Sequence, residues 1–143
     1  MRVFIHILAH KEQIYFAPYV QNIKGHVSYH VPFEKIDTRS TPLDVGKITI
    51  YAIELAKNID VQRDAVRDAI EGQLQIKTWS GILSKCLHAF IFVEENEGAI
   101  SIKINRAIKY KGGLLREEMH KAFLDNPEDI GKKVLEALYY YKK

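Results

Sequence analysis

The feature that most constrains the fold of this chain is a seven-residue phrase that occurs twice. The copies read TPLDVGK at residues 41–47 and NPEDIGK at residues 126–132, and each leads into a stretch with helical periodicity. Thr or Asn can cap a first helical turn, proline fits the next position because no amide hydrogen is needed there, and the aspartate lies near the positive end of the helix dipole. The phrase therefore predicts two similar helices, one over roughly Pro42 to Lys57 and one starting at Pro127.

Each copy also places a glycine, Gly46 or Gly131, in the first helical turn. Glycine costs about 1 kcal/mol relative to alanine inside a helix, so its presence needs a reason. We interpret both glycines as sites where the turn packs closely against a sheet. A phosphate-binding loop is the alternative, but neither glycine belongs to a glycine-rich loop and no strand followed by Gly-x-Gly precedes either copy.

The remaining segments read mainly as strands, because apolar and polar residues alternate along them. A second helical pattern runs from Asp60 to Leu74, Glu95 to Gly98 forms a hairpin turn, Phe33 to Ser40 reads as a loop, and Leu114 to Phe123 fits strand or helix. We therefore predict a single α+β domain over residues 1–143, a mainly antiparallel sheet with the two proline-capped helices packed against it. The expected strands are Val3 to Leu8, Gln13 to Tyr19, Gly25 to Val31, Leu87 to Glu94 and Ala99 to Ile104.

The amino-acid composition indicates the cellular compartment of the protein but says little about its function. A chain of 143 residues with a net charge of +3 fits one globular domain with a buried core. Its single cysteine, Cys86, excludes an internal disulfide and suits a reducing compartment. The apolar N-terminus includes His6 and has no cleavage signature, and no run is long enough to span a membrane. We expect a cytoplasmic protein without membrane contact.

Histidine spacing is the first candidate for a metal site. His6 and His10 lie four residues apart, as do His26 and His30, and on a helix that spacing can share a metal ion. Both pairs fall in segments read as strands, where four residues cover about 13 Å, too far for one ion. We therefore predict surface or rim histidines, no bound metal and no cofactor.

Catalytic constellations are also missing from the sequence. Cys86 and His88 lack a third orienting group, the adjacent carboxylates lack an apolar pocket that would separate their pKa values, and no nucleophile-elbow, Walker or zinc motif occurs. We predict a protein that is not an enzyme, with a small hydrolase or nuclease as the least favoured alternative.

Two groups of residues are candidates for binding. A basic cluster with Tyr110 among it could follow a phosphate backbone, which leaves a small nucleic-acid-binding or other interaction module as an alternative function. At the C-terminus, Tyr141 belongs to the apolar stripe of the last helix, whereas Tyr139 and Tyr140 are candidate contact residues. The basic cluster consists of Lys103, Arg106, Lys109, Lys111 and Arg116.

The order of these motifs resembles the immunity proteins of bacterial contact-dependent growth inhibition systems. The resemblance rests on Asp44-Val45-Gly46 with Ala52-Ile53, Asp129-Ile130-Gly131 with Ala137-Leu138, Trp79-Ser80 through Phe90, and Glu97 to Ile100, and it covers most of residues 40–143.

The resemblance implies a protein that binds the C-terminal domain of one cognate toxin in the cytosol and protects the producing cell. Such toxins are often nucleases with basic faces, which an immunity partner commonly meets with acidic groups, so the net charge of +3 departs from the family expectation. Either a local acidic patch makes the contact or the toxin is not strongly basic, and the oligomeric state is left open. The acidic candidates are Asp60, Asp64, Asp68 and Glu71, which share one helix face, followed by Glu94, Glu95 and Glu97 at the hairpin turn.

Overall fold

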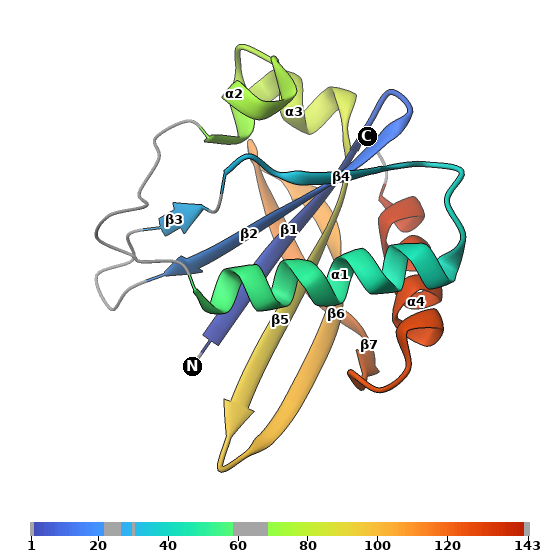
Figure 1. Cartoon of the computed structure of the whole chain (residues 1–143). Coiled ribbons are helices and arrows are strands. Elements are labelled where there is room, and N and C mark those ends of the chain that lie inside the picture. Colours follow the sequence, from blue (N-terminus) through green and yellow to red (C-terminus); the bar gives the residue numbers. More distant parts are fainter. Residues whose placement is uncertain (1, 22–26, 30, 59–68, 142–143) are drawn as a thin grey trace.

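The computed structural model describes residues 2–21, 27–29, 31–58 and 69–141. Within these residues, four strands come first, then three helices, three further strands and a last helix, in the arrangement of Figure 1. Their bounds are β1 Arg2–His10, β2 Gln13–Gln21, β3 Val27–Tyr29, β4 Glu34–Asp37, α1 Pro42–Lys57, α2 Ala69–Leu74, α3 Trp79–Lys85, β5 Leu87–Asn96, β6 Ala99–Tyr110, β7 Gly113–Ala122 and α4 Pro127–Tyr140.

The strands form one antiparallel sheet in the order β3-β2-β1-β5-β6-β7, and β4 pairs with β2. The predicted α+β class with an antiparallel sheet is confirmed, and the ambiguous segment from Leu114 becomes β7. Two elements differ from the sequence interpretation. Glu34–Asp37, read as a loop, pairs with β2 as β4, and Trp79–Lys85, for which no helix was predicted, forms α3 with Thr78 as its N-cap.

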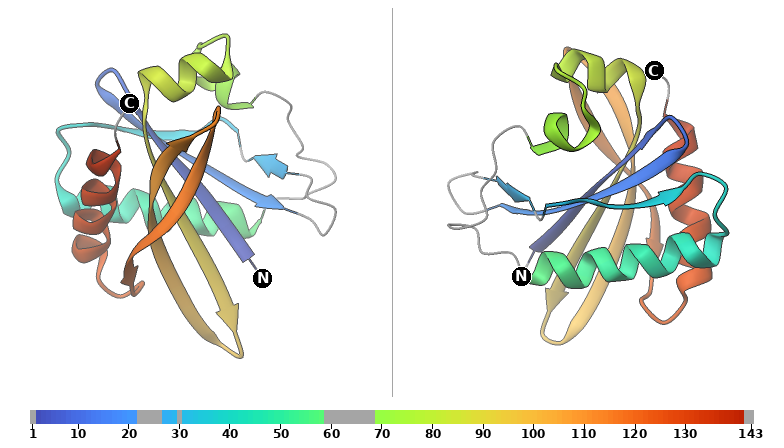
Figure 2. Two further views of the ribbon diagram at one scale, coloured as in Figure 1. Left: turned by 180° about the vertical axis from the view of Figure 1, so that it is seen from behind. Right: turned by 45° about the horizontal axis from the view of Figure 1, so that its top comes forward.

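The main core lies between one face of the sheet and the helices α1 and α4 (Figure 2). Strand alternation sends Ile5 and Ile7 of β1, Ile91 of β5 and Ile104 of β6 to this helix-packed face, where all four are fully buried. Burying such side chains contributes about 2 kcal/mol each. The helices therefore lie on this face of the sheet.

Both helices begin as the repeated phrase predicts. The side chain of Thr41 accepts a hydrogen bond from the amide of Asp44, and that of Asn126 accepts one from the amide of Asp129. The predicted reason for the glycines is wrong, because neither packs against the sheet. A β-carbon on Gly46 would lie 1.7 Å from the carbonyl oxygen of Pro127. The first turns of α1 and α4 therefore pack against each other.

The opposite face of the sheet carries a second, smaller core at one end. There α2 and α3 cover Leu8 of β1 and Ala17 of β2, with Ile70, Leu74 and Ile82 filling the layer. Seen from behind, no described helix covers the lower part of this second face (Figure 2). No helix among the described residues is long and apolar enough to span a membrane.

Candidate partner-binding surface

The acidic candidates do not form one surface among the described residues. Asp60, Asp64 and Asp68 lie outside the described part of the chain, so only Glu71, at the start of α2, can be placed from this group. The β5–β6 turn lies at the opposite end of the molecule from α2 (Figure 1). The structure therefore separates Glu71 from the hairpin carboxylates.

The hairpin turn forms a projecting acidic tip. Glu97 and Gly98 both have positive φ angles, of 52° and 81°, as a tight two-residue hairpin requires, which confirms the role expected of Gly98. Glu95 and Glu97 are exposed, and Glu94 accepts a hydrogen bond of 2.8 Å from the side chain of Asn96. The tip therefore carries negative charge but has no apolar residues at its centre.

The three C-terminal tyrosines divide between the core and the surface. Tyr141 is 4% exposed and donates a hydrogen bond from its hydroxyl to the carbonyl oxygen of Leu83, which confirms its predicted place in the core. Tyr139 and Tyr140 are 54% and 48% exposed. Both are thus free to make contacts beyond the chain.

Tyr140 lies beside the basic strand β6. The Arg106 guanidinium carbon is 4.2 Å from the centre of the Tyr140 ring, and the same guanidinium forms an ion pair with Glu117 of β7. Desolvation opposes its charge, but Glu117 and Tyr140 together raise the pKa of Arg106 above its ordinary value. Arg106 is therefore a fixed cation stacked on an exposed aromatic ring.

A hollow of about 350 Å³ opens beside this pair, lined by Arg106, Ala107, Ile108, Lys109 and Tyr140. Alternation along β6 places Ile108 and Tyr110 on the same face as Arg106, and Ile108 pairs with Leu115 of β7. Tyr110 and Leu115 are each about half exposed. We call this the Arg106–Tyr140 surface, defined by Arg106, Ile108, Tyr110, Leu115 and Tyr140.

The predicted basic cluster is divided by the sheet. Arg106 lies on the helix-packed face, whereas Lys103 lies over the Phe92 ring and Arg116 over the Phe90 ring on the second face. Strand alternation causes the division, because Lys103 and Arg106 are an odd number of positions apart. The described basic residues therefore do not form one continuous track for a phosphate backbone.

On the second face, Arg116 closes an aromatic hollow of about 180 Å³. Its guanidinium carbon is 4.5 Å from the centre of the Phe90 ring, and its Nη2 atom donates a 2.6 Å hydrogen bond to the hydroxyl of Tyr19. Burial raises the pKa of Tyr19, although Arg116 opposes that shift. The phenol is therefore neutral at physiological pH, and Arg116 is already held by its neighbours.

Beneath Arg116, two buried histidines form a hydrogen-bonded pair. Nε2 of His6 lies 2.9 Å from Nδ1 of His88, and Nε2 of His88 lies 3.1 Å from the carbonyl oxygen of Ile82. Since that carbonyl only accepts, Nε2 of His88 carries a proton and its Nδ1 accepts from His6. Burial lowers the pKa of His88 to about 4, and burial, then His88 and Arg116, lower the pKa of His6.

The burial of His6 corrects the prediction that it is a surface or rim histidine. His6 is 3% exposed and His88 is fully buried, whereas His26 and His30 lie outside the described residues. The partner of His6 is 82 residues away in the sequence, so spacing could not identify it. Within residues 2–21, 27–29, 31–58 and 69–141, no group of three or more His, Cys, Asp or Glu side chains could hold a metal ion.

Sequence reasoning singled out Arg106 and Tyr140 but assigned them to different groups. It missed Ile108 and Leu115 altogether. Ile108 and Leu115 are apolar and lie on the strand face that carries Arg106. This shared face can be recognised only once the β6–β7 register is known. The surface is therefore a product of tertiary structure.

Comparisons with known proteins show the fold. No family model and no curated protein matches the chain. A protein of unknown function from Neisseria meningitidis, NMB0488, matches with a TM-score of 0.67 and 14% identity over 99% of this chain and 96% of that chain. A chain of a CdiA-CT/CdiI toxin and immunity complex from Yersinia pseudotuberculosis matches with a TM-score of 0.66 and 12% identity over 99% of this chain and 98% of that chain.

Proposed function

We propose that this chain is a non-enzymatic inhibitor that binds and neutralises a protein toxin domain. The observation that carries the proposal is the fold, which is similar over nearly the whole chain to a chain of a CdiA-CT/CdiI toxin and immunity complex. The motif order from Asp44 to Leu138 resembles the immunity proteins of such systems, which indicates the inhibitor rather than the toxin. In this account the protein acts in the cytosol of the producing bacterium.

The Arg106–Tyr140 surface is the candidate contact region. Tyrosine and arginine are enriched among the residues that dominate binding energy, and such residues work best at the centre of a contact that excludes water. Tyr140, Tyr110 and Leu115 supply exposed apolar area, and Arg106 supplies a preorganised cation. The hollow beside them can accept a side chain of the toxin.

The charge of this region determines the chemistry of the partner. Arg106, Lys109 and Lys111 are cationic, and Glu117 offsets only one of them. We therefore propose that the toxin presents an acidic and apolar patch to this surface. A strongly basic nuclease face would instead meet the acidic tip at Glu94, Glu95 and Glu97, so the two contacts predict opposite sets of sensitive residues.

Inhibition by binding needs a stable complex and no chemistry on the inhibitor. A specific interface of standard size buries about 1,600 Å² in total, with a few anchors giving most of the energy. Charge steering across the interface would speed the encounter and select the cognate toxin. Neutralisation then consists of covering or distorting the toxin's working surface.

The proposal is tested by protection and by mutational scanning of both surfaces. The toxin domain encoded by the adjacent upstream reading frame would be expressed in cells with the wild-type chain, with Tyr140→Ala, and with Glu95→Gln/Glu97→Gln. Tyr51→Ala is the matched control, because Tyr51 on α1 is exposed to the same degree as Tyr140. Survival with the wild-type chain and its loss with Tyr140→Ala support both the function and the surface.

Other outcomes separate the parts of the proposal. Protection that survives Tyr140→Ala but fails with the hairpin variant would move the contact to the acidic tip and leave the function intact. A domain that is harmless, or that kills equally with and without this chain, would contradict the inhibitor role. Binding of the chain to nucleic acid with a steep salt dependence would then support the alternative of a nucleic-acid module.

A further inference from the structure

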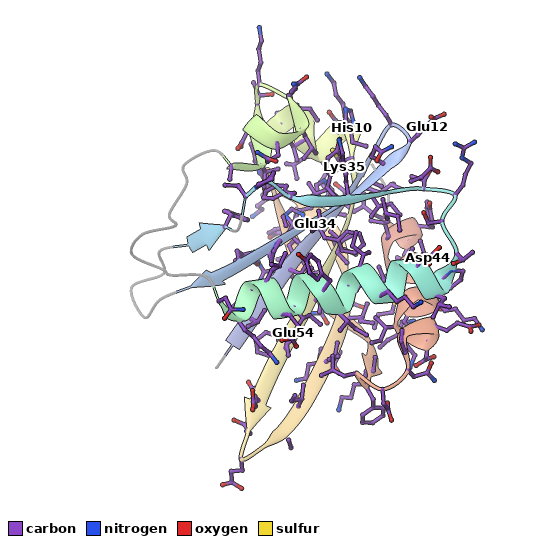
Figure 3. The ribbon with its side chains drawn as sticks, in the orientation of Figure 1. His10, Glu12, Glu34, Lys35, Asp44 and Glu54 are labelled. Carbon is purple, nitrogen blue, oxygen red and sulfur yellow. The ribbon has the colours of Figure 1, made fainter. Side chains whose placement is uncertain are left out.

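A second hollow, which shares no lining residue with the Arg106–Tyr140 surface, lies where the β1–β2 turn meets α2, α3 and β4. Its volume is about 480 Å³. His10 and Lys11 line it from the end of β1 and the turn, and Lys35 lines it from β4, where it pairs in register with Tyr15 of β2. Figure 3 shows His10 and Lys35 near the β1–β2 hairpin, with Glu12 at its tip. The remaining lining residues are Tyr15, Gln73, Leu74, Gln75, Ile76 and Lys85.

The charged residues that line this hollow are all basic. Lys11, Lys35 and Lys85 line it, and no Asp or Glu is among its described lining residues. The chain as a whole has 21 Lys and Arg against 18 Asp and Glu, so three bases without an acid is a local concentration. None of the three lysines forms an ion pair with another described residue.

The polar groups of the lining are also arranged as donors. The side-chain oxygen of Gln73 accepts a 3.1 Å hydrogen bond from the amide of Phe33. This bond fixes the orientation of the side-chain amide, and the amide nitrogen of Gln73 can donate to a ligand. Lysine ammonium groups only donate, so the strongest groups around the hollow all require an acceptor.

His10 supplies an independent observation. Its Nδ1 atom is buried and has no hydrogen-bond partner among the described residues. A buried ring nitrogen without a partner is costly in a folded protein, and His10 is one of the residues that line the hollow.

We propose that this hollow, which we call the lysine hollow (His10, Lys11, Lys35, Gln73 and Lys85), binds a small phosphorylated ligand carrying more than one negative charge. Lysines bind phosphate as point charges, without the fixed fork of arginine, and three of them around one hollow fit a ligand with two phosphate groups. The volume exceeds that of a single inorganic ion. The site does not depend on the proposed toxin contact, since it shares no residue with the Arg106–Tyr140 surface.

The test is calorimetric titration of the full chain with pyrophosphate at low ionic strength. Saturable binding of one equivalent is expected, and Lys35→Gln/Lys85→Gln should weaken it by about tenfold or more because two of the three cations are lost. The control Lys121→Gln/Lys132→Gln removes the same charge from β7 and α4 and should change affinity by less than about twofold. The side-chain amide resonance of Gln73 should shift on titration in the wild-type chain.

Several results would overturn the proposal. An equal loss in the control variant would show a response to net charge and not to a site. Absence of saturation up to about 10 mM pyrophosphate would exclude a useful affinity. Tighter binding of a single-stranded oligonucleotide than of pyrophosphate, unaffected by Lys35→Gln/Lys85→Gln, would assign the charge to nucleic acid elsewhere on the chain. Each of these results leaves the outcome of the toxin protection assay unchanged.

Discussion

Gly46 of α1 lies directly against the backbone of Pro127 at the start of α4, and a β-carbon at Gly46 would be 1.7 Å from the Pro127 carbonyl oxygen. The relationship is reciprocal, because a β-carbon at Gly131 would be 1.7 Å from the carbonyl oxygen of Pro42. The two copies of the repeated phrase are therefore the two halves of one helix–helix contact. In each proline-capped turn, a glycine lies against the backbone of the other turn.

This contact predicts that Gly46→Ala is strongly destabilising. The added methyl group meets backbone atoms, so α1 and α4 must move apart and loosen the core beneath them, at a cost of about 3 kcal/mol. Urea unfolding followed by circular dichroism measures the loss as a lower midpoint.

Gly72→Ala is the matched control for that experiment. Gly72 lies in α2 and has no atom within 4 Å of a β-carbon built on it. Alanine there should leave stability unchanged or raise it by about 0.5 to 1 kcal/mol. Equal losses at Gly46 and Gly72 would show that the cost is not a clash between helices.

The buried pair of His6 and His88 predicts acid sensitivity. In the unfolded chain both histidines have a pKa of about 6.5, whereas in the fold His88 has a pKa of about 4 and the pKa of His6 is also lowered. The unfolded state therefore binds more protons between these values, so stability is complete above about pH 6.5 and falls as the pH drops toward 4.

The size of the effect can be measured by unfolding the protein across this pH range. For His88 alone the loss by pH 4 is roughly 3 kcal/mol, since one unit of pKa corresponds to about 1.4 kcal/mol. A His6→Phe/His88→Phe variant, if folded, should show a flatter profile between pH 4 and 6.5. A flat wild-type profile would contradict this account.

Arg116 should stabilise the second face through its shape as well as its charge. The guanidinium lies over the Phe90 ring and binds the Tyr19 hydroxyl. Arg116→Lys keeps the charge but loses the planar stacking, so we expect a loss of about 1 kcal/mol in unfolding free energy. Arg39→Lys is the control, because the exposed Arg39 pairs with Asp37 and its substitution should cost less than about 0.5 kcal/mol.

The proposed toxin contact predicts a specific loss of affinity. Tyr140→Ala removes the ring under Arg106 and should weaken the complex by about 2 kcal/mol, or roughly thirtyfold, mainly through faster dissociation. Surface plasmon resonance with the purified toxin domain measures this change. Tyr51→Ala should bind like the wild-type chain, and similar losses in both variants would argue against a contact centred on Tyr140.

The features that were predicted correctly from the sequence are those that depend on neighbouring residues along the chain. Thr41 and Asn126 cap their helices as expected, Tyr141 is buried, and Gly98 takes the positive φ that its turn requires. The helix at Trp79 was missed although Thr78 is an ordinary N-cap, because its short apolar run also fits the approach to a strand. Strand β4 was missed since its order comes from pairing with β2 and not from its own residues.

The candidate sites could be predicted only in part, because they join distant segments. Arg106 meets Tyr140, and His6 meets His88, through the register of the sheet and the docking of α4. The two glycines correctly indicated close packing of each first helical turn, but the sequence could not show that the packing partner of each turn is the other helix. The lysine hollow likewise brings together side chains from the β1–β2 hairpin, β4 and the α2–α3 region.

The most direct test of the central claim is coexpression of this chain with the toxin domain encoded by the adjacent upstream reading frame, followed by counting of viable cells and copurification. We predict survival only when the chain is present, and a one-to-one complex with a dissociation constant in about the nanomolar range. Equal killing with and without the chain, or full protection without a detectable complex, would contradict neutralisation by binding.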